Sequence, residues 1–458
     1  MKPSHAVRAV FDDPNLVSAA GLVPALRLAG AAGLEDLLEQ RLSVGSPNAT
    51  TKATCVVAGM LAGADSIEDL DLLRHGGMAR LFEGVRAPST LGTFLRSFTH
   101  GHVQQLDAVN GRLLAGLSTQ VPGLLPGGGC AAGMAFIDLD DTIREVHGYA
   151  KQAAAYGYTR QRGLNVQLAT VSTPLAAPVI ARARLRRGNT ASAAGAGRML
   201  AQAIVTARAA GVRSQVLCRA DSAYYGWALV GTALRHDAWF SVTARMDPKV
   251  TAAIASIAED AWHPIQYTHA VFDHQEQRWI SDAEVAEIDF VAFTGRRKAE
   301  HVPCRLVVRR VRRLGPSGHG NDQGELFASY RHHAFITNST LDTVAADARH
   351  RDHAIVEQVI AELKDGPLAH LPSGHYAANA AWVACAVIAF NTARATAAAA
   401  DLAKARWASL RKKIINVPAR IAASGRRLIL HLPVHWPWAQ HWQTLHAAAT
   451  GPPRPLTT

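Results

Sequence analysis

The stretch GMAFIDLDDTIREVHG, residues 133–148, decides the fold class. Its short apolar run with a polar end is typical of a β-strand that leads into a turn. Because side chains alternate along a strand, Phe136, Asp138 and Asp140 fall on one face. Two acids on one face near the end of an apolar strand would repel each other if they were buried without a cation. The strand pattern therefore makes Asp138 and Asp140 alternative candidates for one metal ligand.

The residues after this strand predict an α/β fold with a mixed sheet. Residues 164–173 (LNVQLATVST) and 178–187 (PVIARARLRR) read as two further strands, and 192–211 read as a helix. Residues 214–222 (SQVLCRADS) form the next strand, which ends in Asp221. The order strand, strand, strand, helix, strand is that of an α/β domain. An Asp that closes a strand also commonly forms a turn or caps a helix, so Asp221 alone identifies no site.

The predicted secondary structure changes on either side of this core. Helical periodicity fills the N-terminal part and ends at the break LLPGGG (124–129). A later region of short strands is predicted to be a mostly β insertion, after which HHAFITNS (332–339) returns as a strand of the core. The predicted units are a helical N-terminal DNA-binding region (1–128), the two parts of the core (129–240 and 331–400), the β-rich insertion (241–330) and a basic C-terminal DNA-binding segment (401–458).

Two helices in the N-terminal region leave two interpretations open. DSIEDLDLLR (65–74) is predicted to be one helix, and Ser89 is predicted to cap a second one. The second helix carries apolar residues at helical spacing up to Phe98. Such a pair fits a helix-turn-helix that reads DNA, but any helical bundle gives the same pattern.

The charge distribution fits a polyanionic partner. The chain has 48 Lys plus Arg against 36 Asp plus Glu, a formal net charge of +12. From Asp401 to Thr458, nine basic residues stand against Asp401 alone. Two further basic tracts are RARLRR (182–187) and RLVVRRVRR (305–313). DNA is the commonest polyanion for such tracts, although an Arg-rich protein without a nucleic-acid partner gives the same totals.

Several other classes of protein are disfavoured. The five cysteines are far apart and form no CxxC pair, so neither a zinc site nor a disulfide framework is indicated. The N-terminus has no apolar core segment, so no signal peptide is predicted. The most apolar stretch, residues 377–390, is expected to be too short to span a bilayer and to form a buried helix.

A third acid lies in HRDHAIVEQVIAELKDG (350–366). Read as one helix, this segment places His350, His353, Glu357 and Lys364 in one stripe, because their spacings are 3, 4 and 7 residues. The apolar residues form a separate stripe. A solvated polar stripe on a surface helix would give the same pattern.

Three motifs together resemble the DDE transposases of bacterial insertion sequences. They are Asp140-x-Thr142, Arg-Ala-Asp-Ser at 219–222, and Glu357-x6-Lys364. The superfamily motif Tyr-x2-Arg-x3-Glu-x6-Lys has the spacing of His350, His353, Glu357 and Lys364. Over roughly residues 60–400, the chain more closely resembles the branch catalogued as insertion-sequence family thirteen-eighty, through IDLDDTIREVHGYAKQ, RLRRGNTAS, VLCRADSAYYGW and EQVIAELKDGPLAHLPSG.

The resemblance implies an RNase H-like core that holds two Mg²⁺ or Mn²⁺ ions between Asp140, Asp221 and Glu357. In that scheme Asp140 bridges the ions, Asp221 and Glu357 complete one ion each, and Lys364 contacts the DNA backbone. The implied activity is cleavage at insertion-sequence ends and strand transfer into target DNA. No nucleotide cofactor is expected, and the sequence has no P-loop.

The expected partners are duplex DNA with terminal inverted repeats, target DNA and a second copy of the chain in the DNA complex. No membrane partner is expected, and the expected location is the cytoplasm, in association with the nucleoid. The residues expected to contact DNA are Lys364, His350, His353, Arg309, Arg310, Arg312, Arg313, Arg411, Lys412 and Lys413.

Two departures from the family pattern leave alternatives open. His350 stands in place of Tyr and His353 in place of Arg, so their charge depends on pH as that of Arg does not. The Asp-x-Thr pattern selects Asp140 as the first acid, whereas strand geometry also allows Asp138. The alternative functions are a catalytically inactive DNA-binding protein on the same scaffold and an RNase H-like nuclease.

The insertion contains Trp262 and Trp279 near the second basic tract. In related hairpin-forming transposases, a β domain at this point contacts a flipped base. A flat aromatic side chain can replace lost base stacking. The other interpretation, and the one that we favour for each, is that both tryptophans belong to the core of a small sheet.

Overall fold

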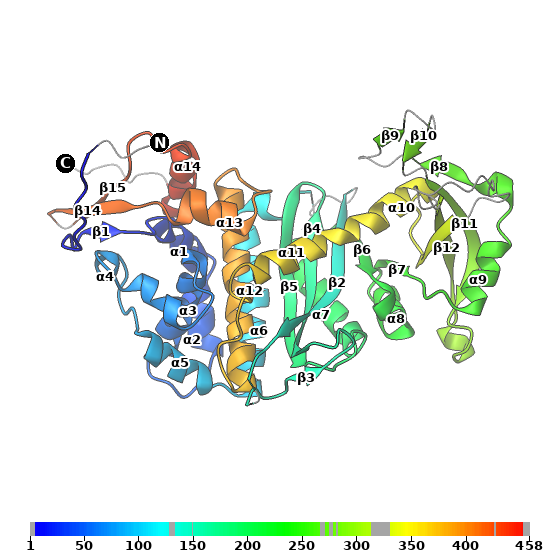
Figure 1. Ribbon diagram of the computed structural model, residues 1–458, viewed down its shortest axis with the longest axis horizontal. Helices are drawn as coiled ribbons and strands as arrows, with labels where there is room; N and C mark the ends of the chain where they lie inside the picture. Colours follow the sequence, from blue (N-terminus) through cyan, green and yellow to red (C-terminus); the bar gives the residue numbers. More distant parts are fainter. Residues whose placement is uncertain are drawn as a thin grey trace.

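The computed structural model describes residues 5–127, 133–148, 150–265, 271–273, 278–280, 283–312, 330–425 and 427–451. Helices occupy the N-terminal part, and a large mixed sheet follows (Figure 1). The predicted mixed α/β fold with a helical N-terminal region is therefore confirmed.

The N-terminal region packs as a helical bundle, and its buried apolar residues belong to the same core cluster as those of the sheet. Its α-helices are α1 (Leu22–Ala31), α2 (Leu34–Arg41), α3 (Ala49–Ala62), α4 (Met78–Leu81), α5 (Pro88–Arg96) and α6 (His100–Gln120). The helix predicted over 65–74 is a short 3-10 helix, Glu68–Leu73. The predicted cap at Ser89 is wrong, because α5 begins at Pro88 with Ala87 at the N-cap. Proline favours the first helical position, since its fixed φ suits the helix and its missing N–H is not needed there.

The main sheet has ten strands among the described residues. Its order is β3-β4-β2-β6-β7-β13-β12-β11-β8, with β5 also paired to β4. Strands β2, β6 and β7 run parallel, and the other neighbours are antiparallel. The bounds are β2 (Met134–Glu145), β3 (Ala155–Tyr156), β4 (Arg162–Thr173), β5 (Ala176–Arg187), β6 (Gln215–Ala220), β7 (Trp239–Thr243), β8 (His263–Ile265), β11 (Ala283–Ala292), β12 (Val302–Arg312) and β13 (Tyr330–Thr337).

Two helices connect the central strands. Helix α7 (Ala196–Ala209) joins β5 to β6 and packs on β2, β4 and β5, while α8 (Trp227–Arg235) joins β6 to β7. Both present apolar residues to the sheet, as amphipathic helices in such crossovers do. These connections place the end of β6 beside the middle of β2.

The β-rich insertion continues the main sheet. Strand β13 pairs with β7 on one side and β12 on the other, and β11 follows β12. A short helix, α9 (Pro248–Ala255), precedes these strands, and β9 (Val271–Asp273) and β10 (Arg278–Ile280) form a separate pair. Strand β13 is the returning strand predicted at 332–339, and its main-chain hydrogen bonds tie the insertion to β7.

The opposite edge of the sheet is closed by side chains. The side-chain amide of Asn391 pairs with the main chain of Ile180 in β5, accepting at 2.8 Å and donating at 2.8 Å. Asn391 also donates to Asn110 of α6 at 3.0 Å. These bonds occupy groups that an exposed edge strand would leave free for pairing with another chain.

Asn391 lies on the long apolar helix α12 (Tyr376–Ala399). The prediction of a stretch too short to span a membrane is wrong in length, since α12 is long and apolar enough to do so by composition. Most of its residues are buried inside the fold, where it contacts α6, α3 and β5, so the prediction of a buried helix is confirmed.

The C-terminal segment returns to the N-terminal bundle (Figure 1). Strand β14 (Ala419–Ser424) pairs with β1 (Leu16–Val17) and with β15 (Arg427–His431). Helix α14 (Ala439–Thr450) contacts α1. Before β14 in the chain, α13 (Trp407–Leu410) and a π-helical turn at Arg411–Ile415 bury Trp407, Ile414 and Ile415.

Candidate active site

Asp140 and Asp221 stand at matching positions of two neighbouring parallel strands. The β2–β6 register pairs Asp138 with Arg219 and Leu139 with Ala220, so the next positions along are Asp140 and Asp221. Neighbouring strands lie about 4.8 Å apart. Two acids that are 81 positions apart in the sequence (221 − 140) are thereby brought side by side on adjacent strands.

The surroundings of Asp140 and Asp221 are electrostatically unfavourable for two ionised carboxylates without a cation. Burial raises the pKa of Asp140 to about 6, and the charges of Asp221 and Asp141 act in the same direction. Reduced hydration also raises the pKa of Asp221, although its side chain is exposed and accepts a hydrogen bond from the Ala223 N–H at 3.0 Å. The cationic form of His353 would favour both carboxylates. A positive ligand would therefore be stabilised here.

Asp138, the alternative first acid, is held in an internal ion pair. Its carboxylate accepts hydrogen bonds from Arg219 Nε at 2.6 Å and Nη2 at 2.8 Å, and from His353 Nδ1 at 3.0 Å. Burial alone would raise the pKa of Asp138, but the charge of Arg219 and these hydrogen bonds hold it below its usual value. Because the side chain of Asp138 is fully buried and occupied, the geometry favours Asp140 as the first acid.

The third acid lies on a helix that is interrupted. Helix α10 (Thr343–Arg351) is followed by a 3-10 turn at Asp352–Ala354 and then by α11 (Ile355–Lys364), so the prediction of one continuous helix is wrong. A 3-10 turn has three residues per turn, which changes the direction of side chains across the break. His353 consequently turns toward Asp138 in β2.

Glu357 and Lys364 follow His353 along α11, which contacts β2. Burial lowers the pKa of Lys364; the charge of Arg144 acts in the same direction, and that of Asp140 opposes it. His353 and Lys364 thus both interact electrostatically with Asp140, and Glu357 lies between them in the sequence with its side chain exposed.

His350 is placed in the core. It stacks on Phe335 with ring centroids 4.1 Å apart and forms hydrogen bonds with Ser241 Oγ at 2.8 Å and Thr243 Oγ1 at 3.1 Å. Burial lowers its pKa to about 3, so the ring is neutral at physiological pH. This placement does not support the predicted contact with DNA.

The acids fit a divalent cation in part. Asp140 and Asp221 supply the carboxylate oxygens that Mg²⁺ and Mn²⁺ prefer, in a place where the raised pKa of each favours a cation. Within the described part of the chain, no group of three or more His, Cys, Asp or Glu side chains is close enough to hold a metal. Glu357 therefore does not complete a three-ligand cluster in this conformation.

Comparison with known families decides the class of protein. The family model for the transposase DDE domain, group 1, matches residues 2–450. The chain belongs to this family. A comparison with curated proteins gave no match. Membership suggests a catalytic transposase and implies DNA as a partner, and enzymes of this family typically use divalent metals.

The basic tract in β12 of this transposase-family chain is largely paired. Arg309 donates to Asp347 at 2.7 Å, and Arg310 donates to Glu259 at 2.9 Å and Glu284 at 2.6 Å. Their carboxylate partners reduce the charge that these two residues offer to DNA. The side chain of Arg312 and the whole of Arg313 lie outside the described residues. In β5, Arg182 and Arg186 are likewise paired, with Asp107 and Asp141.

The three cations at 411–413 that were predicted to contact DNA differ in their exposure. Lys412 is exposed, whereas Arg411 and Lys413 are half-buried. Lys413 lies over the ring of Trp438 at 5.3 Å. Burial lowers the pKa of Arg411, and the charges of Asp365 and Asp65 oppose that shift. Lys412 is thus the most available of the three to a phosphate.

Trp262 is a core residue of the β-rich region. It is 9% exposed and lies against the Arg310 guanidinium at 4.3 Å. His332 packs beside it, with ring centroids 6.3 Å apart. The core interpretation is therefore supported for Trp262, while the side chain of Trp279 lies outside the described residues.

Sequence reasoning missed the residues that surround the acids. Arg219 was quoted only as part of a motif, yet it pairs with Asp138. Asp141 points to an internal network in which it accepts from Asn165 and from Arg186 Nη2, the latter at 2.7 Å. Tyr158 is exposed nearby, where partial burial and the charges of Asp141, Asp140 and Asp221 raise its pKa. These pairings depend on strand register and tertiary packing, for which a single sequence gives no signal.

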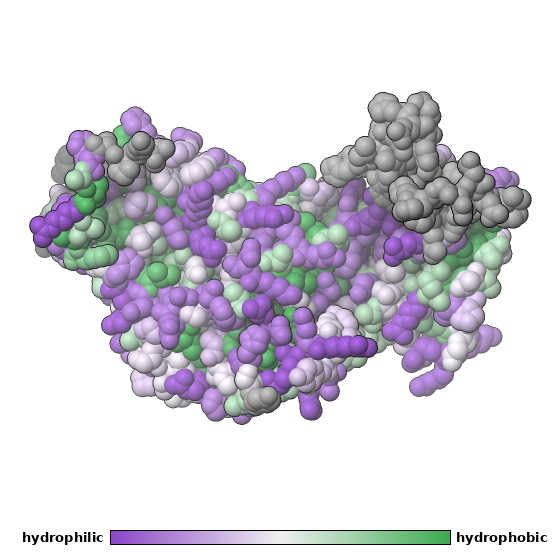
Figure 2. Space-filling view, viewed as in Figure 1, coloured by the Kyte–Doolittle hydropathy of each residue, from purple (hydrophilic) through white to green (hydrophobic). Residues whose placement is uncertain are grey.

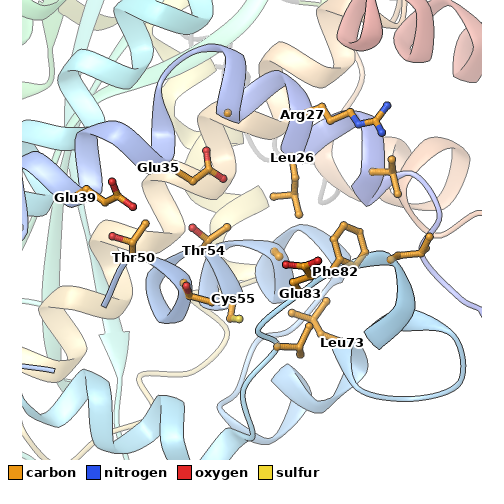
Figure 3. A pocket seen from close by; sticks show the side chains of 16 residues that line it. Leu26, Arg27, Glu35, Glu39, Thr50, Thr54, Cys55, Leu73, Phe82 and Glu83 are labelled. Carbon is orange, nitrogen blue, oxygen red and sulfur yellow. The ribbon is translucent and has the colours of Figure 1, made fainter. Parts of the chain in front are cut away.

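The N-terminal bundle contains a cavity of about 540 Å³ that is separate from these acids. Polar side chains gather on one side of the cavity, and the apolar side chains on the other side lie near the charged Arg27 and Glu83 (Figure 3). The polar group is Glu35, Glu39, Thr50 and Thr54, and the apolar group includes Leu26, Leu73 and Phe82. None of the candidate catalytic residues lines it.

Proposed function

We propose that this chain is an active transposase that cleaves DNA at insertion-sequence ends and joins the ends to target DNA, with Asp140, Asp221 and Glu357 as its catalytic acids. The observation that carries the proposal is the alignment of Asp140 with Asp221 on parallel strands, together with the raised pKa of each. Family membership supplies the reaction class.

The strand order supports an RNase H-like core as the scaffold. From β5 through β4, β2 and β6 to β7, three antiparallel strands are followed by parallel ones. Numbered by their order in the chain, these five strands lie side by side in the order 3-2-1-4-5. An open sheet of this kind offers the carboxyl ends of its parallel strands to a ligand. Asp221 directly follows the carboxyl end of β6, and Asp140 lies at the matching position of β2, just past the last parallel pair.

When bound, divalent cations would activate a water or a 3′-hydroxyl and stabilise the leaving oxygen of a phosphodiester. Asp140 and Asp221 would hold the ions from the sheet, and Glu357 would approach from α11. Lys364, half-buried on α11, would pair with the DNA backbone. The cationic form of His353, which is hydrogen-bonded to Asp138, would favour the ionised forms of Asp140 and Asp221.

The DNA would cross the middle of the molecule. Figure 2 shows many hydrophilic side chains across the middle of the visible face, where Figure 1 places α11. Exposed cations of the C-terminal segment, among them Lys404, Arg406 and Lys412, would contact phosphates outside the cleavage site. A second copy of the chain would hold the other end of the element, and the reaction would take place on cytoplasmic DNA.

A strand-transfer assay tests the proposal. Duplexes that carry the inverted repeats flanking the gene are incubated with the full chain, a supercoiled target plasmid and Mg²⁺. We expect cleavage at the repeat end and covalent joining of donor 3′ ends to the plasmid. Cleavage without joining would identify a nuclease, and binding without cleavage would identify an inactive DNA-binding protein.

A further inference from the structure

A buried polar cluster lies directly behind the candidate acids. Asp138, two residues before Asp140, and Arg219, two residues before Asp221, are paired across β2 and β6 in a two-pronged ion pair. The side chain of Arg219 is 1% exposed and that of Asp138 is 0% exposed. The Arg219 guanidinium also lies over the ring of Phe136 at 4.2 Å, so it is enclosed on a further side.

The same cluster reaches the helical segment that carries the third acid. Arg219 Nη1 donates to the main-chain oxygen of Arg349 at 2.7 Å, at the end of α10. His353, in the 3-10 turn, shares a hydrogen bond of 3.0 Å with Asp138 Oδ1. Glu357 lies about one helical turn after His353 in the chain. One cluster therefore contacts all three elements that bear candidate acids.

We propose that Arg219, Asp138 and His353 form a positioning cluster that sets α11, and with it Glu357, relative to the strands that carry Asp140 and Asp221. Each member fixes a different element: Asp138 fixes β2, Arg219 fixes β6, and His353 fixes the start of α11. The charge-assisted bonds are short and excluded from water, which gives them directional strength. The effect of this positioning cluster on catalysis rests on the proposed transposase function.

This role differs from a direct contact with DNA at His353. A phosphate ligand needs an exposed donor, whereas the His353 side chain is 16% exposed and is engaged with Asp138. Asp138 already accepts two bonds from Arg219, so an Arg at position 353 would bring a second guanidinium to an occupied carboxylate. A Gln at position 353 could still donate to Asp138.

The test compares His353→Leu, His353→Gln and His353→Arg, with His75→Leu as the control at an exposed histidine remote in sequence. Spin labels are attached to Ala361→Cys on α11 and Val205→Cys on α7, both exposed, in a background that lacks Cys304 and Cys130. The distance distribution between the labels is measured without metal or DNA. Donor-end cleavage and metal-free DNA binding are measured in parallel with the unlabelled full chains.

We expect His353→Leu to displace or broaden the label distance and to lower cleavage by about 10- to 100-fold, with DNA binding unchanged. His353→Gln should keep the distance and most of the activity, and His353→Arg should fall below His353→Gln. If His353→Leu does not fold, His353→Ala makes the same comparison without new bulk against Asp138.

A label distance in His353→Leu that matches the parent chain would overturn the positioning role. Full activity in His353→Arg together with weaker DNA binding in His353→Leu would instead make His353 a phosphate ligand. If the parent chain cleaves no DNA, the proposed function fails, but the label distances still decide whether the cluster positions α11.

Discussion

At the scale of single residues, Asp138 and Asp140 show what a sequence pattern leaves open. Strand alternation puts both on one face, and the Asp-x-Thr motif alone prefers Asp140. The distinction arises from Arg219 on another strand, which forms an ion pair with Asp138, whereas Asp140 forms no such ion pair within the described residues. A single sequence carries no information on the strand register that creates this pairing, and the burial of His350 was missed for the same reason.

Substitutions at the two positions should therefore have different effects. Asp140→Asn should lower donor-end cleavage by at least about a thousandfold, on the order of 4 kcal/mol of transition-state stabilisation, without lowering stability. Asp138→Asn should lower the free energy of unfolding by about 3–5 kcal/mol, because it leaves Arg219 buried without a counterion. Urea unfolding and cleavage rates measure both. A stable but inactive Asp138→Asn would reverse the two assignments.

The raised pKa of Asp140 predicts a pH dependence of stability. The folded-state pKa of about 6 lies above the ordinary 3.8, so the folded chain binds this proton more tightly than the unfolded chain. The stabilising contribution is complete below pH 3.8 and is lost as the pH rises through 6. Without divalent cations, Asp140→Asn should gain stability over the parent by about 1 kcal/mol between pH 4 and pH 7. If the difference in stability between Asp140→Asn and the parent chain stays constant from pH 4 to pH 7, the pKa of Asp140 is not raised in the folded chain.

At the scale of elements, most strands and helices could be predicted because their periodicity is local. Strand β2, strand β6 and helix α7 follow from alternation and from apolar spacing. The break between α10 and α11 could not be predicted, since it depends on bonds from His350 to β7 and from His353 to β2. Tertiary contacts of this kind override the local helical pattern.

Strand β5 carries none of the candidate catalytic acids, so the contribution of its edge to stability can be tested separately from catalysis. Asn391→Ala removes the amide that pairs with Ile180 and leaves buried main-chain groups without partners. We expect a loss of about 2–3 kcal/mol in the free energy of unfolding, with cleavage by the folded fraction retained. Asn189→Ala, at an exposed position, is the matched control. Equal stability of the two variants would mean that the hydrogen bonds of Asn391 to β5 do not stabilise the fold.

At the scale of the whole molecule, charge and periodicity did not predict how distant segments of the chain pack together. The C-terminal segment was predicted from its charge alone, whereas the structure shows β14 paired with β1 and Trp407 in the core. Pairing between residues some 400 positions apart has no local signal. A simple truncation after Asp401 would therefore remove part of the N-terminal core rather than only charge.

Exposed cations of that segment should still contribute affinity for DNA. Replacing Lys404, Arg406, Lys412 and Arg427 with Gln should flatten the slope of log K against log salt by up to about 3–4, if each meets a phosphate. The control replaces an equal number of exposed arginines outside the C-terminal segment: Arg41, Arg96, Arg112 and Arg213. Equal slopes for the two sets would assign the effect to net charge rather than to this surface.

The central claim is that Asp140, Asp221 and Glu357 form one metal centre, and Mn²⁺ binding measured by electron paramagnetic resonance tests it most directly. The full chain bound to an insertion-sequence end should bind two ions, and Asp140→Asn, Asp221→Asn and Glu357→Gln should each weaken at least one of them tenfold or more. Glu39→Gln, at an exposed acid of α2, should bind as the parent does. Parental binding by Glu357→Gln would contradict the account, because the third acid would then lie outside the centre.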